Sequence, residues 1–426
     1  MQRRYFLGLL GFLGLGGVSG YYGFRELQHV KSWPDEGRFF NACLESKLSD
    51  ELANHEIVLS ALDGINTTQV WDGHVHLLGL GDTESGIWIN PRSLSMFNPK
   101  HYVQFRFYLN ASCPVPNMSV DEGFIVRLKR LHWGRGTRFI LLAFDYSYNE
   151  QGERLRDQTA FYIPNNYAAK IHKQFPDTFE WIASIHPYRK DCVEALEHAF
   201  INGARGVKWL PPAMGMNPAS KLCDRFYAAM AYWDIPLLCH CGHENSISGT
   251  NTQSYGNPLA LRRALDHGVK VVIAHCASLG NSQDIDKGQN GPWVSNFDLF
   301  TRLMDETRYE GLLFGDISAM TQVNRLKIVE TVIIRQDWHP RLLYASDYPL
   351  PGVMPLISLK LLKEKQYITA EQVKVLTPLR QHNPLLFDFV LKRLMQVRGQ
   401  HFGSEVFHTR SLWTGARSIS KNWPIV

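Results

Sequence analysis

The sequence lacks several features that would assign it to a class directly. Its 45 Lys and Arg residues nearly balance 40 Asp and Glu residues, which gives a formal net charge of +5 over 426 residues. No Lys/Arg-rich block with interleaved aromatic residues occurs, so nothing predicts a nucleic-acid partner. The seven cysteines form neither a Cys-x-x-Cys pair nor a dense framework, and we predict no disulfide bonds. With 45% hydrophobic and 20% charged residues, the chain has an ordinary globular composition.

Long hydrophobic runs are also scarce, and the one in residues 1–23 is short. It begins with the adjacent Arg3 and Arg4, continues through Phe6, and ends near Val18. A membrane-spanning helix needs about 20 apolar residues, so this segment is more typical of a signal. It resembles a twin-arginine signal, and a Sec signal or a plain anchor is the alternative. No clear A-x-A cleavage site follows. We therefore expect a protein of the periplasm or of the periplasmic face of the inner membrane, where the segment can act as a membrane tether.

The remaining chain divides into an N-terminal helical extension (24–66), a large domain (67–398) and a C-terminal tail (399–426). In the extension, Ser49 is the predicted N-cap of one helix over 49–62. In the large domain, strand-length apolar runs cover 70–76, 138–145, 180–186, 204–210, 236–241, 270–275, 312–317 and 341–346. Helical patterns between them cover 192–202, 220–233, 258–267, 297–307 and 323–335. Apolar strands that alternate with helices indicate a parallel sheet buried on both faces. Eight strands suit an α/β fold of the (β/α)8 TIM-barrel type with long βα loops, and an open doubly wound sheet is the alternative.

We favour the barrel because polar residues fall at the carboxyl ends of the predicted strands, where barrel active sites are built. These residues are His74, His76, Lys208, His240, His275 and Asp347. His74 and His76 are two residues apart, so in a strand their side chains point to the same side. Two imidazoles on rigid backbone suit a divalent transition metal. The sequence therefore predicts a metal site at one end of the barrel.

Other residues near these strand ends are weaker candidates. His186 ends the third predicted strand and His243 follows His240, so we expect both to contact substrate. Cys239 and Cys241 flank His240, and alternation turns their side chains to the opposite face, where they serve packing. The long segment after His76 is expected to roof the site. The C-terminal tail is expected to wrap the barrel or to meet a partner subunit in a homo-oligomer.

Five segments carry a resemblance to a known superfamily. They read WDGHVH (71–76), GVKWLPP (206–212), PLLCHCG (236–242), VIAHC (272–276) and LYASDYP (343–349). In order and spacing they resemble the amidohydrolase superfamily, and most closely its branch of aminocarboxymuconate-semialdehyde decarboxylase and related metal-dependent hydrolases. The resemblance extends from about residue 69 to about residue 394 and includes NPLLF at 383–387.

The resemblance implies a ligand set for the metal. His74, His76 and Asp347 would hold one divalent ion, usually zinc, and His240 would bind that ion or a second one. His275 would be a ligand of the second ion or, with a single ion, a general acid or base. The number of bound ions, one or two, is left open by the resemblance.

The resemblance also implies the catalytic groups. Asp347 would accept the proton of a metal-activated water and pass it to the leaving group. Lys208 would bridge two ions if it were carboxylated. We favour the unmodified lysine, which would hold a substrate anion or polarise a carbonyl.

Three functions follow as hypotheses. The first is a metal-dependent hydrolase that attacks a C–O or C–N bond of a small organic substrate. The second keeps the metal but is a non-oxidative decarboxylase of an aromatic or unsaturated acid. The third is a non-catalytic periplasmic binding protein.

Overall fold

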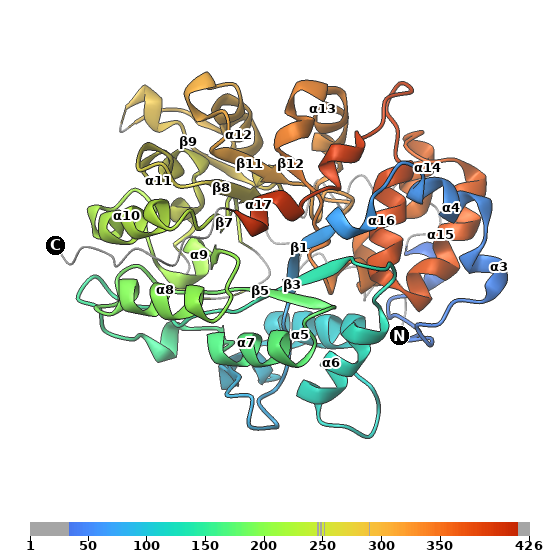
Figure 1. The fold of residues 1–426 in the computed structure, drawn as a ribbon, viewed down its shortest axis with the longest axis horizontal. Helices are drawn as coiled ribbons and strands as arrows, with labels where there is room; N and C mark the ends of the chain where they lie inside the picture. Colours follow the sequence, from blue (N-terminus) through green and yellow to red (C-terminus); the bar gives the residue numbers. More distant parts are fainter. Residues whose placement is uncertain (1–33, 245–246, 248, 251, 289, 416–426) are drawn as a thin grey trace.

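The computed structural model describes residues 34–244, 247, 249–250, 252–288 and 290–415. The predicted signal segment, residues 1–23, lies outside this part of the chain. Within it, no helix is both long and apolar enough to cross a membrane. The fold is mixed α/β with parallel sheets, and strands lie within all eight predicted strand ranges or overlap them (Figure 1).

These strands form two parallel sheets. The first has the order β1 (Trp71–His76), β3 (Arg138–Leu142), β5 (Phe179–Ile182). The second has the order β12 (Leu342–Leu343), β11 (Leu313–Asp316), β8 (Val271–Ala274), β7 (Leu237–His240), β6 (Val207–Trp209). Every strand in each sheet runs parallel to its neighbours, as expected for strands joined by helical crossovers.

Parallel bridges join the two sheets at both edges. At one edge Ala183 pairs with Val207, and the Lys208 N–H donates to the Ala183 carbonyl at 2.7 Å. At the other edge Val75 pairs with Tyr348, and the Asp347 N–H donates to the carbonyl of the first strand's His74 at 2.9 Å. The strands therefore follow one another around a ring, which fits the expected (β/α)8 barrel and not an open sheet.

Helices surround this ring (Figure 1). Those that follow successive strands are α7 (Asn165–Gln174), α8 (Cys192–Ile201), α10 (Asp224–Tyr232), α11 (Arg262–Asp266), α12 (Asn296–Met304) and α13 (Val329–Ile334), with α15 (Ala370–His382) and α16 (Pro384–Leu394) after β12. Their local sequences explain their ends and faces. In α12 the Ser295 side chain caps the helix by accepting from the Asp298 N–H, while Leu299 and Leu303 are buried.

The two faces of the strands hold different residues. Leu238 and Val272 belong to a small apolar cluster inside the ring, together with residues of β1, β3, β5 and β12. Cys239 and Cys241 pack with the large outer cluster between strands and helices, as predicted. Because alternate residues share a face, His240 follows Leu238 on the inner side. The inner face thus carries an apolar layer with polar residues after it at the carboxyl ends.

The C-terminal tail closes the amino-terminal end of the ring. Helix α17 (Arg410–Thr414) places Trp413 against Gly73 and Gly206, where an added Cβ would lie 3.1 Å and 3.3 Å from the indole. Thr409 extends this contact by accepting a hydrogen bond from the Trp71 N–H at 3.0 Å. The described tail residues therefore pack on the barrel, and residues 416–426 lie outside the described part of the chain.

The N-terminal extension differs from its prediction. Ser49 caps a helix as expected, but two short helices, α3 (Asp50–Ala53) and α4 (Glu56–Leu62), replace the single predicted one. The break occurs because His55 acts as a second N-cap, with its Nδ1 accepting from the Ile57 N–H at 3.2 Å.

The prediction of no disulfide was wrong. Cys43 and Cys113 form one with a Cα–Cα distance of 5.4 Å, across 70 residues of sequence. It fastens the N-terminal extension to the end of α5 (Pro99–Ser112). No motif marks the pair, because a single disulfide between distant cysteines leaves no local spacing to detect.

Replacing Cys43 with Ser should lower the free energy of unfolding by about 2–4 kcal/mol, because the disulfide restricts the unfolded chain. Chemical denaturation with and without reductant measures this. Reductant should destabilise the wild type and leave Cys43→Ser unchanged. Equal effects of reductant on both proteins would contradict a structural role of the disulfide.

Candidate functional site

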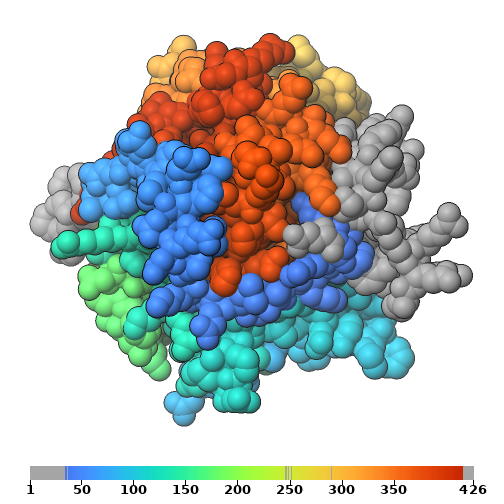
Figure 2. Space-filling view, turned by 90° about the vertical axis from the view of Figure 1, so that its right-hand side faces the viewer, coloured from blue at the N-terminus to red at the C-terminus, as the bar shows by residue number. Residues whose placement is uncertain are grey.

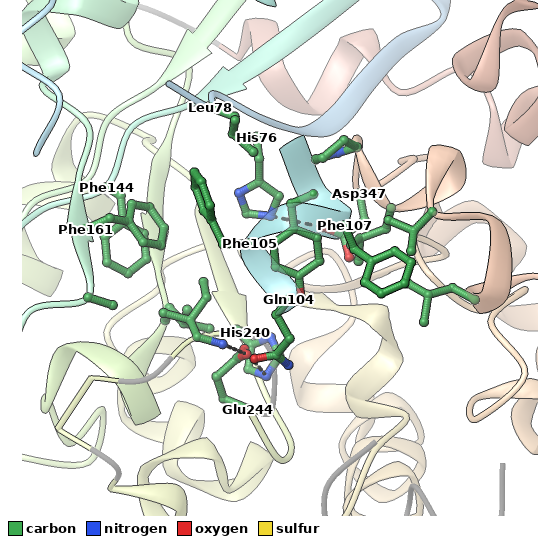
Figure 3. Close-up of a pocket in the computed structure, with 18 of the residues that line it drawn as sticks. His76, Leu78, Gln104, Phe105, Phe107, Phe144, Phe161, His240, Glu244 and Asp347 are labelled. Carbon is green, nitrogen blue, oxygen red and sulfur yellow. Dashed lines mark hydrogen bonds and ion pairs between the residues drawn. The ribbon is translucent and has the colours of Figure 1, made fainter. Parts of the chain in front are cut away.

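A pocket with a cavity volume of about 270 Å³ lies at the carboxyl ends of the strands. Seven of the eight predicted site residues line it: His74, His76, Lys208, His240, His243, His275 and Asp347. In Figure 3, Phe144 and Phe161 line one side of the pocket, across from His76 and Asp347. The α5 residues Phe105 and Phe107 also line it, so the segment after His76 does roof the site.

Asp347 lies where three histidines meet. Its Oδ1 is 3.0 Å from His76 Nε2 and 3.5 Å from His74 Nε2, and its Oδ2 is 3.8 Å from His275 Nε2. Ligand atoms of His74, His275 and Asp347 all lie within 4.8 Å of one another, and these three residues are buried. The ring of His240 is next to this group, with its centroid 5.4 Å from that of His275. The geometry thus gathers the four predicted ligands and adds His275.

The backbone is strained where it delivers two of these side chains. His275 has φ 56° and Asp347 has φ 61°, left-handed values that non-glycine residues rarely adopt. Such conformations cost on the order of 1–3 kcal/mol each and persist where surrounding bonds enforce them. Here the Asp316 carboxylate accepts from the His275 N–H at 2.7 Å, and Asp72 Oδ1 accepts from the N–H groups of His74 and Ser346.

Asp316 also sets the tautomers of two histidines. Its Oδ2 lies 3.0 Å from His74 Nδ1, and because a carboxylate only accepts, that nitrogen carries the proton. The Ser318 hydroxyl donates to Asp316 Oδ1, so its oxygen is left to accept from His275 Nδ1 at 2.6 Å. Both rings therefore present an unprotonated Nε2 to the space beside Asp347, as metal ligands do.

The charge states agree with this arrangement. Burial lowers the pKa of His74 to about 4 and the pKa of His275 and His240 well below the usual range, so all three imidazoles are neutral near pH 7. Burial alone would raise the pKa of Asp347, but the surrounding histidines outweigh it and hold the pKa below its ordinary value. Neutral imidazoles and an ionised carboxylate are the forms that bind a divalent metal.

His240 provides the clearest sign of a missing partner. Its Nε2 is buried and makes no hydrogen bond within the described part of the chain, and Glu244 Oε2 lies 3.5 Å away. Buried polar atoms without a partner are rare in folded proteins. A metal beside His240 would satisfy this nitrogen, so the residues present fit a bound divalent ion.

Lys208 lies inside the same group. Its Nζ is 3.2 Å from His74 Nε2, and burial lowers its pKa while Asp316 and Asp347 oppose the shift. The amine is therefore close enough to the Nε2 atoms to contact a group bound beside them.

His186 is the one predicted site residue that the structure does not bring to the pocket. Its Nε2 lies 3.2 Å from the Met214 carbonyl and its Nδ1 accepts from the Tyr188 N–H. Both ring nitrogens are used within the fold, and the residue lies four residues beyond the end of β5 (Phe179–Ile182) instead of ending the strand as predicted. His243, in contrast, lines the pocket.

Arg325 was missed from the sequence. It is buried in the pocket wall, donates from Nη1 to Ser278 Oγ at 2.5 Å, and keeps Nε without a hydrogen-bond partner among the residues described. The helical pattern predicted over 323–335 assigned it to a helix, where an arginine is usually at the surface. In the structure α13 begins only at Val329, so Arg325 belongs to the loop after β11. Arg325 lies only nine residues after the end of β11, and this closeness to a strand end could have indicated a residue of the pocket.

Comparisons with known proteins identify one matching family model and several solved structures of low sequence identity. A family model described as amidohydrolase matches residues 147–374. No curated protein matches. Among solved structures, an uncharacterised TIM-barrel protein from Bordetella bronchiseptica is 16% identical, with a TM-score of 0.42 over 73% of this chain and 99% of that one. A candidate 2-pyrone-4,6-dicarboxylic acid hydrolase from Pseudomonas putida is 14% identical, with a TM-score of 0.39 over 75% of this chain and 97% of that one. The 2,6-dihydroxybenzoate decarboxylase from Rhizobium is 12% identical, with a TM-score of 0.35 over 66% of this chain and 87% of that one. Similarity at this level says nothing about reaction or substrate.

Replacing Asp316 with Asn should weaken the binding of a divalent metal by about 10- to 100-fold, because an amide can donate to His74 Nδ1 and favour the wrong tautomer. Titration of the metal-free protein with zinc in competition with a chelator measures this affinity.

Asp145→Asn is the matched control. Asp145 is also buried beyond the end of a strand, but it pairs with Arg189 and does not line the pocket. This variant should bind zinc as the wild type does. Equal weakening in both variants would show that Asp316 acts only through general stability.

Proposed function

This chain belongs to the amidohydrolase family, and on that premise we propose that it is a metal-dependent hydrolase that cleaves a C–O or C–N bond of a small organic substrate. The observation that carries the proposal is the buried group of His74, His275 and Asp347, whose ligand atoms lie within 4.8 Å of one another. His275 and Asp347 keep a strained backbone, and Asp316 fixes the tautomers of His74 and His275. A purely structural cluster would need neither feature.

We propose that His74, His76, His240 and Asp347 hold the metal, most plainly Zn²⁺, because three imidazoles and a carboxylate are typical zinc ligands. His275 would join them or bind a second ion. When bound, the ion supplies Lewis-acid catalysis and lowers the pKa of a coordinated water towards about 7.

The protein's own groups complete the reaction. Asp347 is ionised and in contact with three histidines, so it can accept the proton of the attacking water and deliver it to the leaving group. Lys208, 3.2 Å from His74 Nε2, can polarise the substrate carbonyl or hold an anionic group. The aromatic wall formed by Phe105, Phe144 and Phe161 excludes water from the apolar part of the substrate.

Decarboxylation of an aromatic or unsaturated acid is the second candidate, and Arg325 favours it. A buried guanidinium whose Nε has no hydrogen-bond partner among the described residues, in a pocket lined by phenylalanines, is suited to a carboxylate on a flat apolar molecule. The two reactions differ in the fate of water. Hydrolysis in ¹⁸O-labelled water places the label in the product, whereas decarboxylation releases carbon dioxide and places a solvent proton on the product.

Export to the periplasm is proposed on two grounds. The N-terminal sequence resembles a twin-arginine signal or tether. The Cys43–Cys113 disulfide suits an oxidising compartment, since disulfides are rare in the cytosol. A non-catalytic binding role has less support, because the family is enzymatic and the site residues are held in catalytic charge states.

Removing the metal with dipicolinate should abolish turnover of a panel of esters, lactones and aromatic acids, and added zinc should restore it. Asp347→Asn should lower kcat at least about 1000-fold with zinc present, because it removes a ligand and the proton acceptor. Asp145→Asn again serves as the control and should keep its activity. Turnover that survives both chelation and Asp347→Asn would refute the proposed hydrolase.

Replacing Arg325 with Met should weaken the binding of benzoate by about 10- to 100-fold, the usual value of a hydrogen-bonded charge pair. Benzamide, which has the same shape without the charge, should lose little affinity. Isothermal titration of both compounds against wild type, Arg325→Met and Arg325→Lys gives the comparison. Equal losses for benzoate and benzamide would assign Arg325 to packing alone.

A further inference from the structure

The segment that roofs the pocket carries an exposed apolar tip. Leu94, Met96 and Phe97 are 38%, 75% and 101% exposed. Leu94 ends η3 (Pro91–Leu94), and Met96 and Phe97 lie between η3 and helix α5. A methionine and a phenylalanine this exposed on adjacent positions form a patch that a soluble surface rarely presents without a partner.

The tip lies in a stretch of the sequence that has no acidic residue. Residues 85–120 contain no Asp or Glu, although the chain as a whole has 40 in 426 residues, so that about three would be expected in this stretch. The cations in the stretch are Arg92, Lys100 and Arg106. Together with Leu94, Met96 and Phe97 we call these six residues the cap surface. An apolar tip with cations on the same segment complements an anionic interface.

Helix α5 connects the cap surface with the pocket. His101, Gln104, Phe105 and Tyr108 line the pocket and follow the spacing of one helix face. Arg106 is exposed and lies outside that face. One helix therefore has the pocket on one side and a cation of the cap surface on another.

The N-terminal chain is fastened to the same helix. Phe40 stacks on Phe107 with ring centroids 5.0 Å apart, the Asn41 N–H donates to Asn110 Oδ1 at 2.8 Å, and the disulfide from Cys43 follows. In Figure 2 the dark blue N-terminal segment lies between the orange C-terminal helices and the cyan and teal region. Residue 23, the end of the expected tether, is 17 residues before Phe40, which allows at most about 60 Å of extended chain. A tethered molecule would therefore keep the attachment point on α5 within about 60 Å of the bilayer, in reach of its surface.

We propose that the cap surface docks on an anionic phospholipid bilayer, with Met96 and Phe97 in the headgroup region and the three cations against lipid phosphates. The roof of the pocket is then at the membrane interface. This proposal goes beyond the proposed function, and it holds or fails whichever reaction the metal site performs.

A dye at the tip tests the proposal in the full-length protein. The free cysteines of the described chain are all buried, so a new exposed cysteine can be labelled selectively without reductant. Met96→Cys carries bimane, and the protein is mixed with vesicles of phosphatidylglycerol and phosphatidylcholine that contain nitroxide-labelled lipid. Leu222→Cys is the matched control, because Leu222 is also an exposed apolar residue, 45% exposed, on a different element.

We expect quenching at position 96 to exceed that at position 222 by at least about threefold, and most of the excess to disappear in 1 M salt, where charges are screened within about 3 Å. Equal quenching at the two positions would overturn the proposal. So would a bimane shift at position 96 that depends on protein concentration and not on vesicles, because a second copy of the chain would then cover the tip.

Charge reversal separates the docking surface from the enzyme. Arg92→Glu with Arg106→Glu should reduce quenching at position 96 by at least about threefold, while Lys221→Glu with Lys287→Glu, the same charge change at exposed sites elsewhere, should change it little. Both double variants should keep the zinc content of the wild type. Equal loss of quenching in the two variants would overturn a specific cap surface, whereas a wild-type protein that docks but binds no zinc would refute only the proposed function.

Discussion

The position of the Asp316 carboxylate is the constraint on which the site depends. It accepts from His74 Nδ1, from the hydroxyl and the N–H of Ser318 and from the His275 N–H, so its oxygens are committed to four donors at once. Since Ser318 in turn accepts from His275 Nδ1, one buried carboxylate fixes two imidazole tautomers. The Nε2 atoms of both rings are left facing Asp347. Without Asp316, either ring could rotate or move its proton to Nε2, the nitrogen that the proposed metal site requires.

Apolar packing in the barrel offsets the energetic cost of burying so many polar groups together. Below the site the ring is filled by Leu238, Val272 and other apolar side chains, and Trp413 closes its opposite end. Water is excluded from beneath, so burial keeps the imidazoles neutral, while Asp347 stays ionised because histidines surround it. Buried charge and left-handed backbone at the site destabilise the fold, and the packed apolar layers around the site compensate for this.

The sequence predicted what depends on local periodicity. Apolar runs of strand length located all eight barrel strands, and alternation placed His240 on the inner face and Cys239 on the outer one. It did not predict features that depend on long-range geometry. The Cys43–Cys113 pair spans 70 residues, and Arg325 enters the pocket because its helix begins later than the pattern indicated. His186 lies beyond the end of β5, where it bonds to Met214 instead of facing the pocket. Strand ends are therefore reliable indicators of position, and the direction of a side chain in the following loop is not.

A divalent metal is proposed to bind between the residues that Asp316 orders. The most direct test is an anomalous difference map from crystals of the wild-type protein loaded with zinc, recorded at the zinc absorption edge. The account predicts a peak about 2.0–2.2 Å from His74 Nε2 and from a carboxylate oxygen of Asp347, with His76 and His240 completing the coordination. A peak at another place, or an ordered site without one in which Lys208 still contacts His74 Nε2, would contradict it.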